Sequence, residues 1–241
     1  MDGPVVIVGA TGAIGGAVAR RVAARGGALH LVGRDQARLA ALARELGAAH
    51  AVADALDDAA LARAVQAAGP RIGGLAHCVG SIVLKPLRRT GAEDFVSAFR
   101  LNAVSAALAV AAAADGLRAC PGSGVVLFST IAARSGFANH AAISAAKGAV
   151  EGLTVALAAE LAPHVRVNCI APSLTRSAIA APLLANEAVA KGIAAQHPIP
   201  RLGEGDDAGS LAAFLLSEEA GWITGQVFAV DGGRSTVRAK G

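Results

Sequence analysis

The segment at residues 9–15 is of a type that binds phosphate groups. It reads Gly-Ala-Thr-Gly-Ala-Ile-Gly and lies between an apolar run at 4–8 and a helical pattern that begins near Ala13. Glycine lets the backbone approach a pyrophosphate closely, and a helix N-terminus offers free N–H groups and a positive dipole end. The segment predicts a dinucleotide phosphate site. Its expected contact residues are Gly9, Thr11, Gly12, Ile14 and Gly15.

A basic residue follows the second apolar run, where a dinucleotide-binding fold contacts the adenosine ribose. An acidic residue would bind the ribose 2′-hydroxyl of NAD there, but Val32, Gly33 and Arg34 include none. Asp35 comes one residue late and is a good N-cap for the next helix. Arg34 can bind a 2′-phosphate through charge-assisted hydrogen bonds, the alternative being a solvated surface arginine. The sequence therefore favours NADP(H) over NAD(H).

Such a site needs a scaffold that brings several loops to one edge of a sheet. Nearly continuous apolar runs alternate with helical patterns from start to end, which predicts a parallel sheet covered on both faces. The expected fold class is a single-domain, doubly wound (Rossmann) α/β fold with a seven-stranded parallel sheet. Strands are expected at 4–8, 28–32, 50–53, 74–78, 124–129, 165–170 and 228–230, and helices at 13–25, 36–46, 57–67, 92–114, 141–161 and 207–216. Asp57 is a good N-cap for the helix at 57–67.

The interval at 173–200 breaks this alternation. It is a long insertion between a strand and a helix, and such insertions often cover a site, so we expect a substrate lid. No linker or repeat interrupts the chain, so residues 1–241 are expected to form one domain. The lid predicts an apolar wall and a small apolar substrate. Its apolar residues are Ile179, Pro182, Leu183, Leu184, Val189 and Ile193.

The composition argues against several other classes. The net charge is +4, but the arginines are dispersed and aromatic residues make up only 3%, so we expect no nucleic-acid partner. The longest apolar stretch, at 103–114, is shorter than a membrane span of about 20 residues. No signal peptide is expected. Cys78, Cys120 and Cys169 show neither metal nor disulfide spacing, which predicts a cytoplasmic protein without a bound metal.

Further motifs resemble those of the short-chain dehydrogenase/reductase family, and the resemblance covers essentially the whole chain. After the glycine turn they are Asp54, Gly80, Asn102, 128–130 (Phe-Ser-Thr), Lys147, 168–173 (Asn-Cys-Ile-Ala-Pro-Ser), 200–203 (Pro-Arg-Leu-Gly), 223–226 (Ile-Thr-Gly-Gln) and 230–233 (Val-Asp-Gly-Gly). Each motif alone is weak evidence for the family, but their order and spacing together are strong evidence for its fold and cofactor site. The resemblance implies hydride transfer between a nicotinamide cofactor and a carbonyl or alcohol carbon.

The resemblance also implies a cofactor path through the chain. Asp54 would contact the adenine, with help from the Ala55 backbone. The turn at Val79 and Gly80 would pass beside the cofactor. Pro172 and the backbone near Thr175 would flank the nicotinamide, and Lys147 would hold the hydroxyls of its ribose.

Catalytic roles follow from the same resemblance. In the family a tyrosine acts as the acid or base, a neighbouring lysine lowers its pKa, and a serine polarises the carbonyl. Thr130 occupies the serine position and keeps a hydroxyl, with a stiffer rotamer. Asn102 would hold a helix kink and a water that links to Lys147.

The chain departs from the family pattern where proton transfer takes place. The tyrosine position, four residues before the lysine, is Ile143, and the chain contains no tyrosine at all. The second glycine of the family's turn is Ala13, its Asn-Asn-Ala-Gly stretch is His77–Gly80, and its Pro-Gly pair is Pro172-Ser173. The usual acid is therefore missing from an otherwise recognisable frame.

The proton source is consequently open. A positioned general acid contributes about 10²–10⁴-fold, whereas holding a carbonyl against a hydride donor contributes roughly 7–11 kcal/mol, so reduction can survive without the tyrosine. His140 lies seven residues before Lys147, near the spacing at which enoyl-acyl-carrier-protein reductases of the same superfamily place their tyrosine. The alternative is a solvent-facing rim histidine. Ser144 adjoins the empty position, but helical geometry turns it about 100° away. Lys147 can also donate through Thr130 or a water.

Three functions fit these residues. The first is an atypical NADP(H)-dependent reductase of a ketone, quinone or enone, which the retention of Asn102, Thr130 and Lys147 favours. The second is an NADP(H)-binding sensor or partner protein without turnover, and the third a non-redox reaction on the same scaffold. The alanine-rich helices at 92–114 and 141–161 predict a homodimer or tetramer, because their family equivalents pack across dimer axes. The alternative is packing against the sheet alone.

Overall fold

A seven-stranded parallel sheet organises the computed structural model, which describes residues 2–238. The strand order is β3-β2-β1-β4-β5-β6-β7, so the winding direction reverses between β1 and β4. This confirms the predicted doubly wound fold, in which ligands bind outside the carboxyl ends of the strands at the reversal. The strands are β1 (Val5–Val8), β2 (Leu29–Gly33), β3 (Ala49–Val52), β4 (Gly74–His77), β5 (Ser123–Phe128), β6 (Val165–Pro172) and β7 (Val227–Val230).

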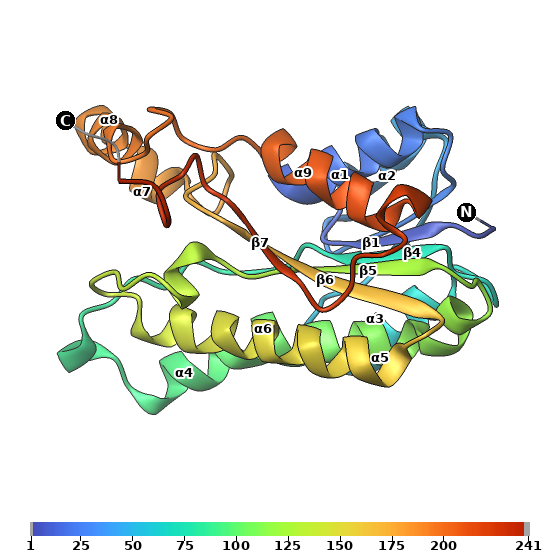
Figure 1. The fold of residues 1–241 in the computed structure, drawn as a ribbon. Coiled ribbons are helices and arrows are strands. Elements are labelled where there is room, and N and C mark those ends of the chain that lie inside the picture. Colours follow the sequence, from blue (N-terminus) through green and yellow to red (C-terminus); the bar gives the residue numbers. More distant parts are fainter. Residues whose placement is uncertain (1, 239–241) are drawn as a thin grey trace.

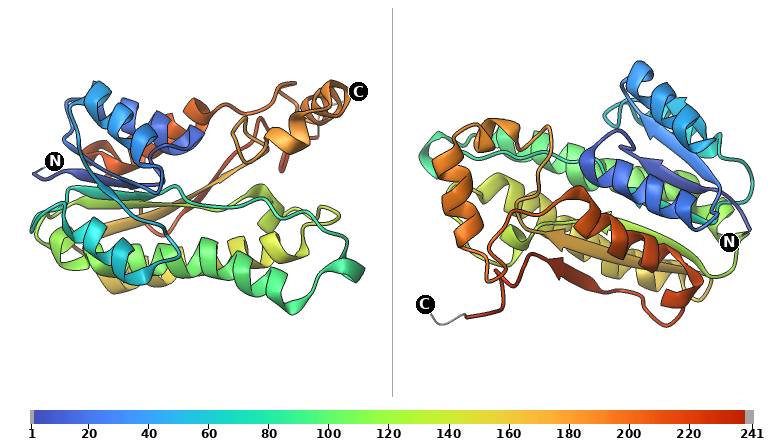
Figure 2. Two further views of the ribbon diagram at one scale, coloured as in Figure 1. Left: turned by 180° about the vertical axis from the view of Figure 1, so that it is seen from behind. Right: turned by 90° about the horizontal axis from the view of Figure 1, so that it is seen from above.

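Helices cover both faces of this sheet, as Figure 1 shows. One layer contains α1, α2 and α9, and the other contains α3, α4, α5 and α6. The short helices α7 and α8 follow β6 and lie apart from both layers (Figure 2). The helices are α1 (Ala13–Ala24), α2 (Gln36–Leu46), α3 (Asp58–Gln66), α4 (Ala92–Phe99), α5 (Ser105–Arg118), α6 (Ala141–Leu161), α7 (Ala181–Leu184), α8 (Glu187–Ala195) and α9 (Gly205–Leu216).

Most of the core of the described residues lies in two buried clusters, one on each side of the sheet, and a small third cluster joins Ala98, Ala142 and Ala146. Alternate residues of a strand point to opposite faces, so Val5 and Ile7 enter one cluster while Val6 and Val8 enter the other. Both faces of β1 are thus buried, which explains why it reads as a continuous apolar run rather than an alternating one.

Most expected element boundaries agree with the structure to within two residues. Two predicted caps are present: the Asp35 carboxylate accepts a hydrogen bond from the Arg38 N–H at 3.0 Å, and the Asp57 carboxylate accepts one from the Ala60 N–H at 2.9 Å. These caps satisfy backbone donors that the first turns of α2 and α3 leave without helical partners.

The helix expected over 92–114 is not continuous, and this prediction is corrected. A π-helical turn, η2 (Arg100–Val104), separates α4 from α5. Inside it the Asn102 side-chain amide donates a hydrogen bond to the Ala98 carbonyl at 2.8 Å. A side chain inserted into the helical hydrogen-bond ladder is a known cause of such a break. The kink that the family resemblance implied at Asn102 is therefore present.

Two helical stretches are long and apolar enough to cross a membrane, although the sequence was expected to contain none. They are Ala92–Arg118 and Ala141–Leu161. Both lie in the helix layer that covers one face of the sheet (Figure 1), as core helices of an α/β fold do. Their alanine-rich, apolar character follows from this close packing.

Candidate active site

A cavity of about 1260 Å³ opens where the loops after β1, β2, β3, β4, β5 and β6 meet. The carboxyl ends of parallel strands lie at one edge of a sheet, so these distant segments converge at the reversal of strand order. Most residues predicted from the sequence line this cavity. They are Gly9, Thr11, Gly12, Ile14, Arg34, Asp54, Ala55, Val79, Gly80, Thr130, His140, Lys147, Pro172 and Thr175.

The glycine turn presents an open helix end to the cavity. Gly12 is the N-cap of α1, no side chain caps that end, and the first turn carries no acidic residue. The Gly9, Ala10 and Gly12 N–H groups donate to backbone carbonyls, whereas the N–H groups of the first helical residues precede the first intrahelical hydrogen bond and can bind an anion. Gly15 does not line the cavity: a Cβ there would stand 2.3 Å from the Gly9 carbonyl oxygen. Its role is to let the helix pack under the turn.

Arg34 and Arg38 lie at the part of the cavity beside the loop after β2. Arg34 lines it as predicted, and Arg38, one helical turn later, lines it as well. The Arg38 guanidinium donates a hydrogen bond to the Thr11 carbonyl at 2.8 Å, which places its charge beside the glycine turn. The Asp35 carboxylate serves as the cap of α2. Arg38, in the first turn of α2, was not predicted from the sequence.

Lys147 is buried at the inner end of the cavity, with 6% of its surface exposed. Its ammonium donates a hydrogen bond to the Phe128 carbonyl at 2.8 Å. Burial lowers the pKa of Lys147 to about 8. Burial also raises the pKa of both Cys78 and Cys169 to about 12, so these thiols stay neutral, in keeping with their reading as small apolar residues.

Asn102 supports the site from behind rather than lining it. Its side chain is 1% exposed, and besides the Ala98 carbonyl it contacts Ser81 through two hydrogen bonds, of 3.1 Å to the hydroxyl and 3.4 Å from the N–H. A Cβ at Gly80 would lie 3.1 Å from the Asn102 oxygen and 3.2 Å from the Lys147 nitrogen. Asn102, Gly80 and Lys147 therefore meet at one point, with Asn102 bracing the loop after β4.

His77, which replaces a family asparagine, also braces β4. Its Nε2 lies 3.1 Å from the Ser105 hydroxyl, and that hydroxyl donates to the Leu101 carbonyl, so Nε2 is the donor in this pair. Burial, followed by the charge of Lys147, lowers the pKa of His77 to about 3. The neutral imidazole thus supplies a bond between β4 and α5 in place of the lost amide.

The position at which the family has its tyrosine is occupied by Ile143, which gives the cavity an apolar wall there. Ile143 is buried and lines the cavity. The Ser144 hydroxyl donates to the Ala132 carbonyl at 2.8 Å and does not face the cavity, as expected. The Thr130 hydroxyl donates to the Pro172 carbonyl at 3.4 Å and accepts from the Ala132 N–H at 3.3 Å. Thr130 therefore lies on the cavity surface, one strand away from Pro172.

His140 is the N-cap residue of α6 and lines the cavity. Its Nδ1 is 2.7 Å from the Ala138 carbonyl, so that nitrogen carries a proton. Its ring is 5.5 Å from the ring of Phe137, over which the Arg234 guanidinium lies at 4.7 Å. His140 is half-buried and lines the cavity, but it belongs to a cluster at the entrance.

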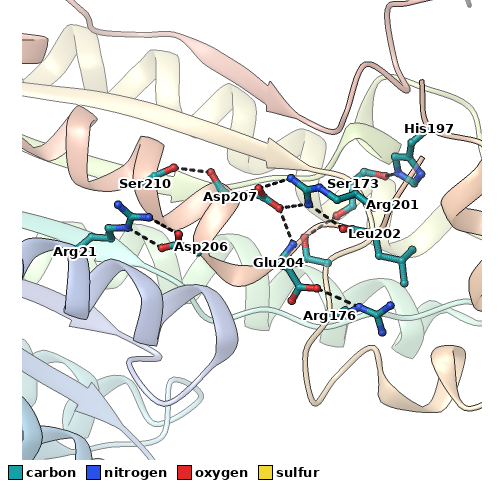
Figure 3. Close-up of polar contacts among 11 residues, drawn as sticks. Arg21, Ser173, Arg176, His197, Arg201, Leu202, Glu204, Asp206, Asp207 and Ser210 are labelled. Atoms are coloured by element: carbon teal, nitrogen blue, oxygen red, sulfur yellow. Dashed lines mark hydrogen bonds and ion pairs between the residues drawn. The ribbon is translucent and has the colours of Figure 1, made fainter. Parts of the chain in front are cut away.

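A serine–histidine pair at the cavity was not assigned from the sequence. Ser173 was noted only as a departure from the family, and His197 not at all. The Ser173 hydroxyl lies 2.8 Å from the buried His197 Nε2, as Figure 3 shows. The serine comes from the end of β6 and the histidine from the turn after α8, so their 24-residue separation hid the pair.

Comparisons with known proteins agree with this geometry. A family model described as enoyl-(acyl carrier protein) reductase matches residues 9–235. The inactive 2-(S)-hydroxypropyl-CoM dehydrogenase 2 of Xanthobacter autotrophicus is 36% identical over 90% of this chain and 99% of its own. A short-chain type dehydrogenase/reductase from Mycobacterium ulcerans has a TM-score of 0.91 at 31% identity, covering 99% and 91%. A gluconate 5-dehydrogenase from Burkholderia cenocepacia, in complex with NADP and tartrate, has a TM-score of 0.90 at 26% identity, covering 98% and 96%.

Proposed function

Because this chain belongs to the short-chain dehydrogenase/reductase family, we propose that it is an NADP(H)-dependent reductase of a small apolar ketone, quinone or enone. The observation that carries the proposal is the cavity itself. It joins the start of α1, the guanidinium groups of Arg34 and Arg38, a buried lysine and a threonine hydroxyl within one largely apolar pocket. When bound, the reduced nicotinamide supplies hydride to the substrate carbonyl carbon.

The residues present fit this cofactor. The free N–H groups at the start of α1 suit a pyrophosphate, and the charges of Arg34 and Arg38 suit a 2′-phosphate. An NADP complex of the structurally similar gluconate 5-dehydrogenase supports the same preference. We assign the adenine to Asp54 and Ala55.

The inner part of the cavity suits the nicotinamide and its ribose. Val79 and Gly80 border the cofactor's path, and Pro172 and Thr175 flank the nicotinamide position. Lys147 holds the ribose hydroxyls through its ammonium, and its burial strengthens that contact because water competes poorly there. The Thr130 hydroxyl turns from the Pro172 carbonyl and donates its hydrogen bond to the substrate oxygen instead.

The substrate half of the cavity is apolar. Residues 173–200 act as its lid and present an apolar surface to the substrate. With Ile143 on the opposite wall, this surface favours a hydrophobic carbonyl compound over a sugar. Of the six apolar lid residues predicted from the sequence, Ile179, Pro182, Leu183, Val189 and Ile193 line the cavity and Leu184 does not.

A second candidate function is NADP(H) binding without turnover, as in a sensor or partner subunit. Two observations favour it: Ile143 cannot donate a proton, and the Xanthobacter relative is named an inactive dehydrogenase. The two candidates share the same cofactor site and differ only in whether the bound cofactor is consumed.

We also propose that the protein is a cytoplasmic homodimer or tetramer. The outer surface of α4 and α6 carries exposed Phe95, Val96, Phe99 and Val155, a cluster that a second copy can cover. A monomeric mass at micromolar concentration in light scattering would contradict the assembly. Replacement of Val155 by glutamate is expected to shift any oligomer toward monomer.

The proposed function is tested in two steps. Fluorescence titration with NADPH and NADH measures the two dissociation constants, and tighter binding of NADPH is expected. NADPH oxidation is then followed with a panel of apolar ketones, quinones and enones. Oxidation with at least one compound supports the reductase, whereas tight binding without oxidation by any compound supports the second candidate. Failure to bind either nucleotide would contradict both.

A further inference from the structure

The Ser173–His197 pair has the geometry of a hydroxyl held ready for proton transfer. The Ser173 oxygen lies 2.8 Å from His197 Nε2, and His197 Nδ1 lies 2.9 Å from the Ile193 carbonyl. A carbonyl oxygen only accepts hydrogen bonds, so Nδ1 carries a proton. In the neutral ring Nε2 is then the acceptor, and the Ser173 hydroxyl donates to it. Oriented histidines that activate a hydroxyl show this same arrangement.

The direction of the hydrogen bond between Ser173 and His197 can also reverse without any movement of heavy atoms. When the imidazole is charged, Nδ1–H still donates to the Ile193 carbonyl and Nε2–H donates to the Ser173 oxygen. The serine O–H then turns away from the ring. Ser173 is half-buried and lines the cavity, so the hydroxyl can turn toward the substrate space.

The position of Ser173 places it next to the reacting centre. The pairing of β5 with β6 ends at Phe128 and Ile170, and Thr130 and Pro172 each follow two residues later. The hydrogen bond from the Thr130 hydroxyl to the Pro172 carbonyl joins these loops directly. Ser173 is the next residue, so two hydroxyl groups flank one peptide unit beside the proposed nicotinamide position.

From this geometry we propose that Ser173 is the proton donor that replaces the missing phenol, with His197 as the residue that positions and recharges it. The inference rests on the proposed reductase function. As the carbonyl carbon accepts hydride, the C=O π electron pair moves to the oxygen. That oxygen takes the proton of the Ser173 hydroxyl, and the serine oxygen takes the proton of His197 Nε2. The products are an alcohol, the oxidised cofactor and a neutral imidazole, which regains a proton from water.

The surroundings of His197 accommodate a charge. Asp231, in the loop after β7, lies close enough for His197 to affect its ionisation. Burial alone would raise the pKa of Asp231, but hydrogen bonds from Ser235 and Gly233 and the charge of His197 outweigh it and lower that pKa. The carboxylate is therefore an anion that can balance an imidazolium. Arg234, another charged residue of this loop, is bonded to Gln196 and lies over the Phe137 ring, and the exposed Arg238 is a third.

The test uses Ser173→Gly and His197→Gln in the full chain. Glycine is the residue that the family has at this position, so Ser173→Gly removes the hydroxyl on a backbone that tolerates it. Glutamine keeps a hydrogen-bonding group near Ser173 but cannot carry a proton. Ser144→Ala, which removes a hydroxyl that points away from the cavity, is the matched control. NADPH affinity, kcat and KM are measured for each variant.

Proton transfer predicts a fall in kcat of about 10²-fold in both variants, with KM and NADPH affinity little changed, and an unaltered Ser144→Ala. If the pair only tethers β6 to the lid, both variants should instead show a raised KM and an unchanged kcat. This result would overturn the proposal. Wild-type protein that consumes no NADPH would overturn the proposed function, a failure visible before any variant is compared.

A second readout needs no cofactor. In ¹⁵N NMR of the free protein, the imidazole signals absent from His197→Gln belong to His197. They are expected to show a protonated Nδ1 and an unprotonated Nε2 at high pH, and Ser173→Gly should shift the Nε2 signal. A protonated Nε2 in the neutral ring, or no response to Ser173→Gly, would contradict the pair.

Discussion

Ile143 and Lys147 lie one turn apart on α6 and both line the same cavity, yet only the lysine can exchange a proton. The lysine ammonium is 2.8 Å from the Phe128 carbonyl, beneath an isoleucine that fills the usual place of a phenol. A buried ammonium is costly to the fold, because burial disfavours its charged form. Its retention beside an apolar wall indicates that the site still has a use for the charge.

Because the Lys147 ammonium is buried, we expect the free energy of unfolding to depend on pH in a defined window. Its pKa is lowered from 10.5 to about 8 in the folded protein, so the full cost of burial is present below pH 8. Between pH 8 and 10.5 the unfolded state holds the proton that the folded state has lost, and stability therefore rises with pH. Relative to Lys147→Met, the wild-type free energy of unfolding should increase by about 3 kcal/mol across this window.

Urea denaturation at several pH values within that window measures this difference. Lys191→Met, which removes an exposed lysine on α8, is the matched control and should give a curve parallel to wild type. The same Lys147→Met variant should lose NADPH oxidation. Parallel curves for wild type and Lys147→Met would show that the ammonium is solvated.

Cofactor selectivity should depend on two arginines. Arg34→Ala and Arg38→Ala each remove a charged donor from the adenosine end of the cavity, and a hydrogen bond to a charged group contributes about 1.5–3 kcal/mol. We expect the Kd for NADPH to rise about 10–100-fold in each variant and the Kd for NADH to change little. Arg44→Ala, an exposed arginine of α2 outside the cavity, is the control. An equal loss of both nucleotides would contradict the assignment of a 2′-phosphate.

Gly80 has no room for a side chain, whereas Gly148, the residue after Lys147, does. In Gly80→Ala the new Cβ meets the Asn102 oxygen at 3.1 Å and the Lys147 nitrogen at 3.2 Å, and must displace one of them. Overpacking of this kind costs about 1–3 kcal/mol, and NADPH binding should weaken with it. Gly148→Ala meets no atom within 4 Å and should stabilise α6 by about 1 kcal/mol. Thermal unfolding and NADPH titration of both variants check this contrast.

The sequence predicted the strands, the helix caps at Asp35 and Asp57, and the sheet edge at which the cavity opens, because these depend on local patterns. Strand periodicity and cap chemistry act within a few residues, and parallel strands necessarily bring their loops together. It did not predict the π-helical turn, because the hydrogen bond of Asn102 to Ala98 breaks an otherwise helical pattern. A kink there was implied only by the family resemblance.

The part of the site that depends on distant residues was harder to read. Ser173 and His197 meet only because β6 and the turn after α8 come together in space, and no local pattern records that contact. His140 illustrates the opposite difficulty. Its spacing from Lys147 suggested a proton donor, and it does line the cavity, but spacing alone did not show that its Nδ1 bonds to the Ala138 carbonyl.

The most direct test of the central claim is the rate of NADPH oxidation by the wild-type protein with apolar carbonyl compounds, measured beside Ile143→Tyr. A reductase that works without a phenol predicts measurable oxidation by the wild type, its loss in Lys147→Met, and a modest change in Ile143→Tyr. An inert wild type alongside an active Ile143→Tyr variant would contradict the account. The protein would then be a cofactor-binding relative whose chemistry was lost with the tyrosine.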